Sequence, residues 1–214
     1  MHSVTDLTTR IVPSRFAGKT LVEFASQTKS QNEALAAAAA VVAGSLRNLV
    51  LVGPPGVGKT HLAAAIVNAI VTRKDVDYQQ RKAEADALPI DQYRQPVIPD
   101  SPMWTNVADL IVSLRMEIDA PPDDREASAA VRTLRRWPEL VVLDDLGREK
   151  SSDWTGEIVY SLVNARYENQ LPTVVTSNLS PADLAASPYW PVISRLAEDG
   201  ALVKVEAPDH RFTK

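Results

Sequence analysis

The stretch GPPGVGKT, residues Gly53 to Thr60, decides the fold of this chain of 214 residues. It follows an apolar run, Leu49 to Val52, and precedes an Ala-rich stretch, His61 to Val71, so it stands between a predicted strand and a predicted helix. Glycine-rich turns in this setting direct backbone N–H groups at phosphate oxygens, and the positive end of the helix dipole points at the same place. The pattern predicts a P-loop that binds a nucleoside triphosphate. A plain Gly/Pro turn between strand and helix is the alternative.

Each position of this loop has an expected role in holding the nucleotide. Lys59 would reach the β- and γ-phosphates, and the Thr60 hydroxyl would hold Mg²⁺. The other candidate positions in the loop are Gly53, Pro54, Pro55, Gly56, Val57 and Gly58. His61 follows directly and is included among the nucleotide-binding candidates, with helix packing as its simpler interpretation.

Two carboxylates follow a second apolar run, Leu140 to Leu143. The run predicts a buried strand that delivers Asp144 and Asp145 to the edge where open α/β sheets bind their ligands. Asp144 would coordinate Mg²⁺ together with Thr60, and Asp145 would orient or deprotonate the attacking water. The alternative is an acidic turn that closes at Gly147.

Three polar residues end a β-branched run, Pro172 to Val175, at the same predicted edge. Asn178 is the first candidate to hold the lytic water near the γ-phosphate, with Thr176 and Ser177 as further candidates. Asn178 could instead form a local Asx turn before the helix that Ser180 caps.

The rest of the chain alternates helices and strands, which predicts a parallel sheet with helices on both faces. Helices are expected at Gln31 to Ala43, Ala108 to Ile118, Arg125 to Trp137 and Trp154 to Gln170, and short strands at Met103 to Asn106 and Thr173 to Thr176. We predict a leader or partner-docking segment at residues 1–30 and an ATPase domain at 31–214. The helical pattern dissolves from about Arg73 to Pro102, so 74–102 is expected to be an insertion or a surface loop.

Composition restricts the class of protein. Hydrophobic residues make up 45% and charged residues 23% of the chain, values typical of a soluble globular domain. Cysteine is absent, which excludes disulfides and thiolate metal sites and suits the cytoplasm. The net charge of −4 predicts no general attraction to nucleic acid, so any DNA contact would need a local patch. We expect no membrane association, because no apolar run reaches the roughly 20 residues of a membrane helix.

Together these motifs resemble the DnaC/IstB branch of AAA+ ATPases, which comprises helicase loaders and transposon helper ATPases. The resemblance covers Val12 to Arg211 and rests on GPPGVGKTHLA, LVVLDDLG, NARYENQLPTVVTSN and Ser194-Arg195-Leu196, with flanks at Val12 to Phe16 and Pro208 to Arg211. It implies ATP and Mg²⁺ as cofactors and a three-layer α/β/α P-loop NTPase of the ASCE type. Its five parallel strands would have the order 5-1-4-3-2, with little or no C-terminal helical lid.

The same resemblance implies further roles and partners. Asn178 matches the sensor-1 position, and Arg195 matches an arginine finger that reaches a neighbouring subunit's γ-phosphate. On its residues alone, Arg195 is an arginine on an amphipathic helix. Arg211 lies where a second sensor could be. The implied activity is slow ATP hydrolysis used as a switch, and the implied partners are a DnaB-like hexameric helicase, single-stranded DNA and further copies of the chain.

Two other functions compete with helicase loading. An IstB-like transposition helper would share every motif but act with a transposase on duplex DNA. A small-molecule phosphotransferase would share the P-loop but predicts an acceptor site and an Arg-rich lid. Arg132, Arg135 and Arg136 share one helical face and could contact DNA phosphates, with a solvated surface as the alternative.

Overall fold

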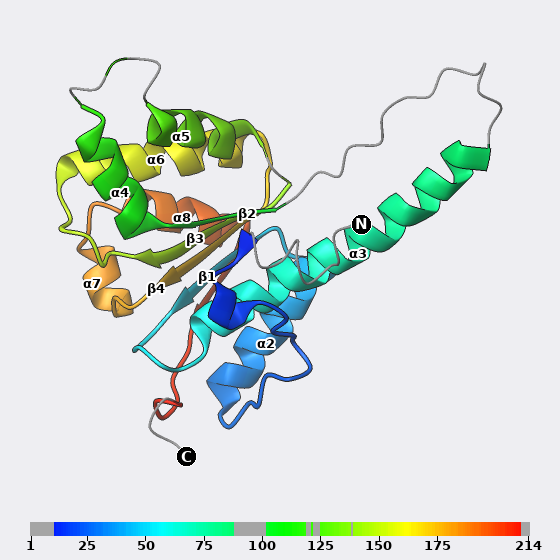
Figure 1. Cartoon of the computed structure of the whole chain (residues 1–214). Coiled ribbons are helices and arrows are strands. Elements are labelled where there is room, and N and C mark those ends of the chain that lie inside the picture. The colour runs from blue at the N-terminus through cyan, green and yellow to red at the C-terminus, as the bar shows by residue number, and fades with distance from the viewer. Residues whose placement is uncertain (1–10, 88–101, 119–120, 122–124, 138, 211–214) are drawn as a thin grey trace.

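A computed structural model describes residues 11–87, 102–118, 121, 125–137 and 139–210. Its centre is one parallel five-stranded sheet with the order β2-β3-β4-β1-β5 (Figure 1). The strands are β1 (Asn48–Val52), β2 (Met103–Asn106), β3 (Val141–Leu146), β4 (Thr173–Ser177) and β5 (Gly200–Lys204). This is the predicted order 5-1-4-3-2 read from the other side, so the fold prediction is confirmed.

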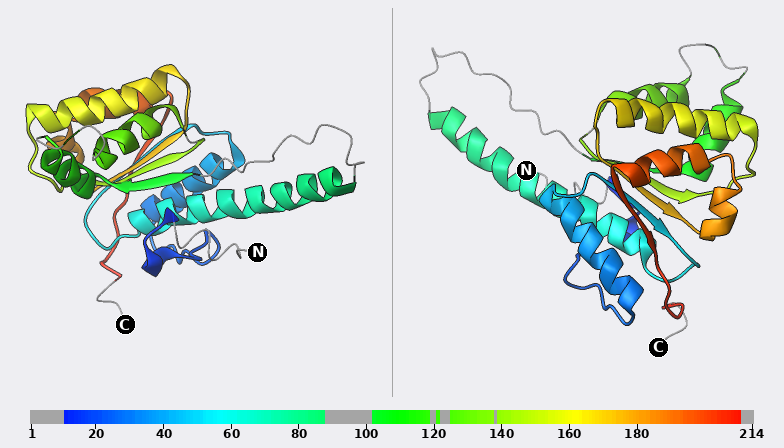
Figure 2. Two further views of the ribbon diagram at one scale, coloured as in Figure 1. Left: turned by 45° about the horizontal axis from the view of Figure 1, so that its top comes forward. Right: turned by 180° about the vertical axis from the view of Figure 1, so that it is seen from behind.

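The strands are apolar throughout because both faces of the sheet are covered. Along β1, Leu49 and Leu51 join one hydrophobic core and Val50 and Val52 join the other, as the alternation of side chains in a strand requires. Helices α2 and α3 cover the first face, and α4, α5, α6 and α8 cover the second (Figure 2). The result is the expected three-layer α/β/α arrangement.

Apart from α3, the helices for which bounds were predicted begin and end close to those bounds. Their bounds are α2 (Lys29–Ala43), α3 (Lys59–Ala87), α4 (Val107–Met116), α5 (Glu126–Arg136), α6 (Asp153–Glu168), α7 (Pro181–Ala185) and α8 (Trp190–Glu198), with a 3₁₀ turn, η1, at Ser14–Phe16. Gly44 ends α2 in the left-handed conformation with φ 77°. The Ser180 side chain caps α7 by accepting from the Asp183 N–H.

The prediction for the segment after the P-loop helix is wrong in its first half. The helix does not end near Arg73 but continues to Ala87 and projects beyond the sheet (Figure 1). Lys, Arg, Gln, Glu and Ala dominate residues 73–87, with neither Gly nor Pro, so intrinsic helix propensity continues the helix after its apolar face ends. Residues 88–101 lie outside the described residues. Within the described part of the chain, no helix, α3 included, has the length and apolarity of a membrane span.

The described part of the N-terminal segment belongs to the first helical layer. Val12 and Phe24 are buried in the core beside α3. The Asn68 amide on α3 donates to the carbonyls of Phe16 and Lys19 at 3.1 and 2.8 Å. These contacts place the segment next to the start of α3, where the P-loop ends.

Candidate nucleotide-binding site

The P-loop lies between β1 and α3, at the edge where the parallel strands end. Its glycines are required by their backbone angles and by the chain packed against them: φ is 81° at Gly56 and 102° at Gly58. A Cβ on Gly56 would lie 1.9 Å from the Asp209 Oδ1, and one on Gly58 would lie 2.5 Å from the Phe24 ring. The N- and C-terminal segments therefore hold the loop from outside in the shape that a phosphate cradle requires.

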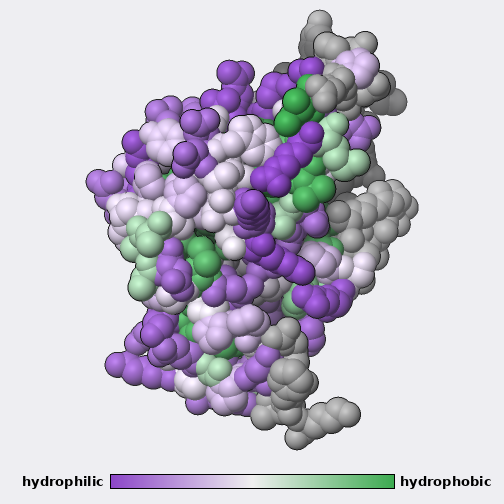
Figure 3. Space-filling model, turned by 90° about the vertical axis from the view of Figure 1, so that its left-hand side faces the viewer, coloured by the Kyte–Doolittle hydropathy of each residue, from purple (hydrophilic) through white to green (hydrophobic). Residues whose placement is uncertain are grey.

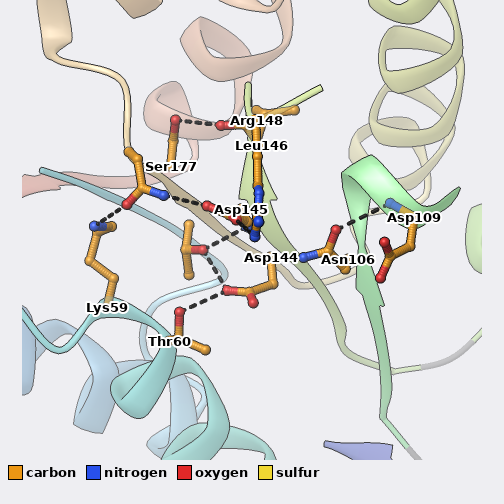
Figure 4. Close-up of polar contacts among 11 residues, drawn as sticks. Lys59, Thr60, Asn106, Asp109, Asp144, Asp145, Leu146, Arg148 and Ser177 are labelled. Atoms are coloured by element: carbon orange, nitrogen blue, oxygen red, sulfur yellow. Dashed lines mark hydrogen bonds and ion pairs between the residues drawn. The ribbon is translucent and has the colours of Figure 1, made fainter. Parts of the chain in front are cut away.

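Lys59 is buried at the centre of the loop, with 5% of its surface exposed. Its Nζ donates to the carbonyls of Gly53 and Pro54, each at 2.7 Å, and to the Asn178 Oδ1 at 2.8 Å. All three acceptors lie around the loop, so the ammonium group is already where phosphate oxygens would approach (Figure 4).

Asp144 and Thr60, the two residues predicted to hold the metal, meet across the loop. The Thr60 Oγ1 donates to the Asp144 Oδ1 at 3.1 Å, and the Thr176 Oγ1 donates to the same oxygen at 2.7 Å. Burial raises the pKa of the Asp144 carboxyl, while the hydrogen bonds from Thr176 and Thr60 lower it. A buried carboxylate oxygen beside a hydroxyl oxygen is the hard donor set that Mg²⁺ prefers, so these residues fit the metal of a P-loop nucleotide complex.

Asp145 leaves the line of the strand. Its φ is 64°, and the pairing of β3 with β4 shifts between Leu143 and Leu146. An irregularity of this kind redirects a side chain. Here the Asp145 carboxylate accepts a hydrogen bond from the Asn178 side-chain amide and forms an ion pair with Arg148 (Figure 4). The backbone N–H of Asp145 donates to the Thr176 Oγ1 at 3.0 Å.

Asn178 faces the P-loop rather than a local turn. Its side-chain oxygen accepts from Lys59 and its side-chain nitrogen donates to Asp145, so it joins the two predicted functional residues. The neighbouring Ser177 hydroxyl instead donates to the Leu146 carbonyl at 2.7 Å, and this bond ties β4 to β3. Of the three candidates that end β4, Thr176 and Asn178 therefore face the site.

Two other candidates lie away from the phosphate-binding loop, and a third is outside the described residues. The His61 Nε2 lies 3.3 Å from the Thr20 carbonyl, and its ring meets Phe24 edge-on, with burial lowering its pKa. His61 thus contacts the N-terminal segment. Arg195 on α8 donates to Asn164 and lies over the Tyr160 ring on α6, with 4.9 Å between the guanidinium carbon and the ring centre. Arg211 lies outside the described residues.

Two residues at this edge were not predicted from the sequence. Asn106 ends β2 directly opposite Asp144 in the strand register, and its side chain caps α4. A polar residue that ends a strand was the signal that identified Asn178, and it could have identified Asn106. Arg148 has no such signal, because its contact with Asp145 depends on a turn that only the structure reveals.

The sheet order and the P-loop edge define a P-loop protein of the AAA+ class. Part of the chain is similar to the IstB-like ATP-binding family. The family model described as IstB-like ATP binding protein matches residues 18–93, and the structural likeness extends over most of the chain. An AAA+ ATP-binding protein therefore agrees with the fold better than a small-molecule phosphotransferase.

Several of the similar solved structures are replication proteins. A crystal structure of the DnaC helicase loader is 28% identical, with a TM-score of 0.67, and the match covers 90% of this chain and 99% of that one. A crystal structure of DnaI is 20% identical, with a TM-score of 0.69, over 95% and 98% of the two chains. Domain III of the Thermotoga maritima replication initiation protein DnaA shares the fold at 18% identity, with a TM-score of 0.60, over 90% and 69%.

Two curated relatives match with lower coverage. YqaM of Bacillus subtilis, which is uncharacterized, is 27% identical over 62% of this chain and 34% of its own length. The Sinorhizobium fredii protein y4iQ/y4nD/y4sD, assigned by name to an insertion sequence as its ATP-binding protein, is 28% identical over 75% and 45%. The chain therefore spans less than half the length of these relatives.

Proposed function

We propose that this protein is an ATP-dependent loader of a replicative DNA helicase, in which slow ATP hydrolysis acts as a switch. The hydrogen-bonded series Lys59–Asn178–Asp145 supports the ATPase, because it links the phosphate-binding cation to the candidate base. The likeness to a DnaC helicase loader over nearly the full length of both chains supports the partner.

The residues of the site divide the work of hydrolysis. Lys59 would exchange the Gly53 and Pro54 carbonyls for phosphate oxygens, and Thr60 with Asp144 would hold Mg²⁺, which neutralises phosphate charge when bound. Asp145 would accept the proton of the attacking water. Once Lys59 turns to the phosphates, the Asn178 oxygen loses its donor and can orient that water.

A second copy of the chain would complete the site. Arg195 would act on a neighbouring subunit's γ-phosphate, and its position on the outer layer at α8 is compatible with an intersubunit role. Arg132, Arg135 and Arg136 are all exposed on α5, so they are accessible to the phosphates of single-stranded DNA inside an oligomer. The N-terminal segment is the proposed docking region for the helicase.

A transposition helper is the second candidate. The IstB-like family description and the relatedness to the Sinorhizobium fredii insertion-sequence protein favour it. Its partner would be a transposase and its DNA would be duplex.

One experiment separates the two candidates. The purified protein is mixed with ATP and Mg²⁺ and then with the same organism's replicative helicase or with a transposase encoded beside it. A loader co-elutes with the helicase and stimulates its transfer to single-stranded DNA. Co-elution with the transposase alone, together with a preference for duplex DNA, would reverse the assignment.

A further inference from the structure

The turn that follows β3 is rigid in its backbone. The Arg148 N–H donates to the Asp145 carbonyl at 3.3 Å, which closes the turn. Gly147 sits inside it with φ 87°, and a Cβ there would lie 2.6 Å from the Leu179 side chain. The Gly147 N–H donates to the Glu149 Oε1 at 3.2 Å. Because the turn is packed and hydrogen-bonded in this way, the backbone and Cβ of Arg148 have a fixed position relative to Asp145.

The turn brings the Arg148 guanidinium onto the Asp145 carboxylate. The Nη1 lies 3.2 Å from the Asp145 Oδ2, while the Oδ1 accepts from Asn178 (Figure 4). Both carboxylate oxygens are therefore engaged. A carboxylate that takes a proton from water needs an oxygen directed at that water.

The two contacts on Asp145 differ in how they respond to nucleotide. Asn178 contacts Lys59, so phosphate binding at Lys59 acts on this side of the carboxylate. Arg148 contacts the other oxygen from outside the P-loop, with 71% of its side chain exposed against 17% for Asp145. Nucleotide binding can therefore rearrange Asn178 while the ion pair persists.

We propose that Arg148 is a brake on hydrolysis: it holds Asp145 in a resting position and keeps basal turnover low until the ion pair opens. The proposal rests on the ATPase function argued above. Arg148 is a positioning residue, because it acts through Asp145 rather than on the nucleotide. Its exposure makes the brake weak and accessible, so the ionic strength of the solution or an anionic group on a partner can release it.

The test measures ATP turnover with Arg148→Ala. We expect kcat to rise about threefold to fivefold, the range that an exposed ion pair permits, with KM for ATP within about twofold of wild type. The kcat of Arg148→Lys should lie between those of wild type and Arg148→Ala, because lysine keeps the positive charge but lacks the planar guanidinium group. Raising the ionic strength should increase kcat of the wild type more than that of Arg148→Ala.

Arg47→Ala is the matched control. It removes an arginine from a similar exposed pair, Arg47–Asp199 at 2.8 Å, which lies at the opposite edge of the sheet, so kcat should not change. Asp145→Asn in the Arg148→Ala background should abolish the gain, because the gain is assigned to that carboxylate.

The outcomes separate the brake from the ATPase itself. If wild type hydrolyses ATP faster than Lys59→Ala, but Arg148→Ala is not faster than wild type, the proposed role of Arg148 is wrong. The proposed ATPase function is then still supported. A gain equal to that of Arg47→Ala would also refute the brake. If neither protein exceeds Lys59→Ala, the ATPase proposal fails and the brake fails with it.

Discussion

The two ends of β4 each hold a buried cation, and the two cations serve different purposes. At the C-terminal end of β4, Lys59 donates to the side chain of Asn178, the residue that follows the strand. It also donates to the carbonyls of Gly53 and Pro54. At its first residue, Arg166 of α6 donates to the Leu134 carbonyl at 2.8 Å, the Pro172 carbonyl at 2.7 Å and the Thr173 Oγ1 at 3.1 Å. Both groups use backbone carbonyls as acceptors in place of water.

The difference lies in what surrounds the acceptors. The acceptors of Arg166 lie on α5, on β4 and on the residue before β4, all within packed structure. The Arg166 side chain itself is fully buried. Burial lowers its pKa to about 10, so it is still charged at neutral pH. The acceptors of Lys59 lie on the glycine-rich loop and on Asn178, which is exposed. Arg166 therefore joins elements permanently, whereas Lys59 has partners that phosphate can replace.

The largest effect expected from this comparison is on stability. Arg166→Ala leaves a cavity and removes the donor that Arg166 supplies to the Leu134 carbonyl, while the Pro172 carbonyl keeps the Val141 N–H as a donor. The free energy of unfolding should therefore fall by about 4 kcal/mol, mostly because of the cavity. Urea unfolding followed by circular dichroism measures it. Nucleotide affinity of the remaining folded protein should be unchanged, since Arg166 lies at the far edge of the sheet.

Arg166→Met is the companion to that variant, because it restores most of the volume but none of the donors. An intermediate loss, about 2 kcal/mol, is expected from the lost hydrogen bonds of the guanidinium to Leu134, Pro172 and Thr173. Wild-type stability in the methionine variant would mean that relief of the desolvation cost offsets the lost hydrogen bonds, and the assigned joining role would then be wrong.

Lys59→Ala should change nucleotide affinity rather than stability, the reverse of Arg166→Ala. Removing the cation should weaken ATP binding at least about 100-fold, equivalent to about 2.7 kcal/mol, with little change in unfolding. Titration of a fluorescent ATP analogue measures the affinity. Lys29→Ala, which removes a lysine that is 92% exposed on α2, is the control and should bind as wild type does. Wild-type affinity in Lys59→Ala would refute the P-loop assignment.

The metal pair Thr60 and Asp144 predicts a smaller effect. In wild type, chelation of Mg²⁺ with EDTA should weaken ATP-analogue binding about tenfold, and Asp144→Asn should remove most of this difference, because an amide is a poorer ligand than a carboxylate. The measurement is the ratio of the two dissociation constants in each protein. An equal ratio in both proteins would exclude Asp144 from the metal site.

Features with a local physical cause could be predicted from the sequence. The P-loop follows from its glycines, the strands from their apolar runs, and the helix ends at Gly44 and Ser180 from their capping chemistry. Asp144 and Asn178 were identified because the polar ends of parallel strands meet at one edge.

Other features depend on tertiary geometry or on a misleading local signal. The continuation of α3 from Arg73 to Ala87 was missed because the apolar period ends while helix propensity continues. The contact of Arg148 with Asp145 arises from an irregular strand pairing and a left-handed residue, neither of which has a sequence signature here. The burial of Arg166 could not be predicted, because in the sequence this residue looks like an ordinary charged residue on a helix.

The smallest prediction compares the two side-chain acceptors of the cations. Thr173→Val removes the buried hydroxyl that accepts from Arg166, and we expect a loss of about 1 kcal/mol in unfolding free energy because the buried donor has no water to replace it. Asn178→Ala removes the acceptor of Lys59 at an exposed position, where a loss under about 0.5 kcal/mol is expected. Chemical unfolding of both variants, side by side with ATP turnover, separates the roles: Asn178→Ala should lower turnover and Thr173→Val should not. Equal stability losses would mean that the Lys59 cluster is as fixed as the Arg166 cluster, and that phosphate could not displace its partners as proposed.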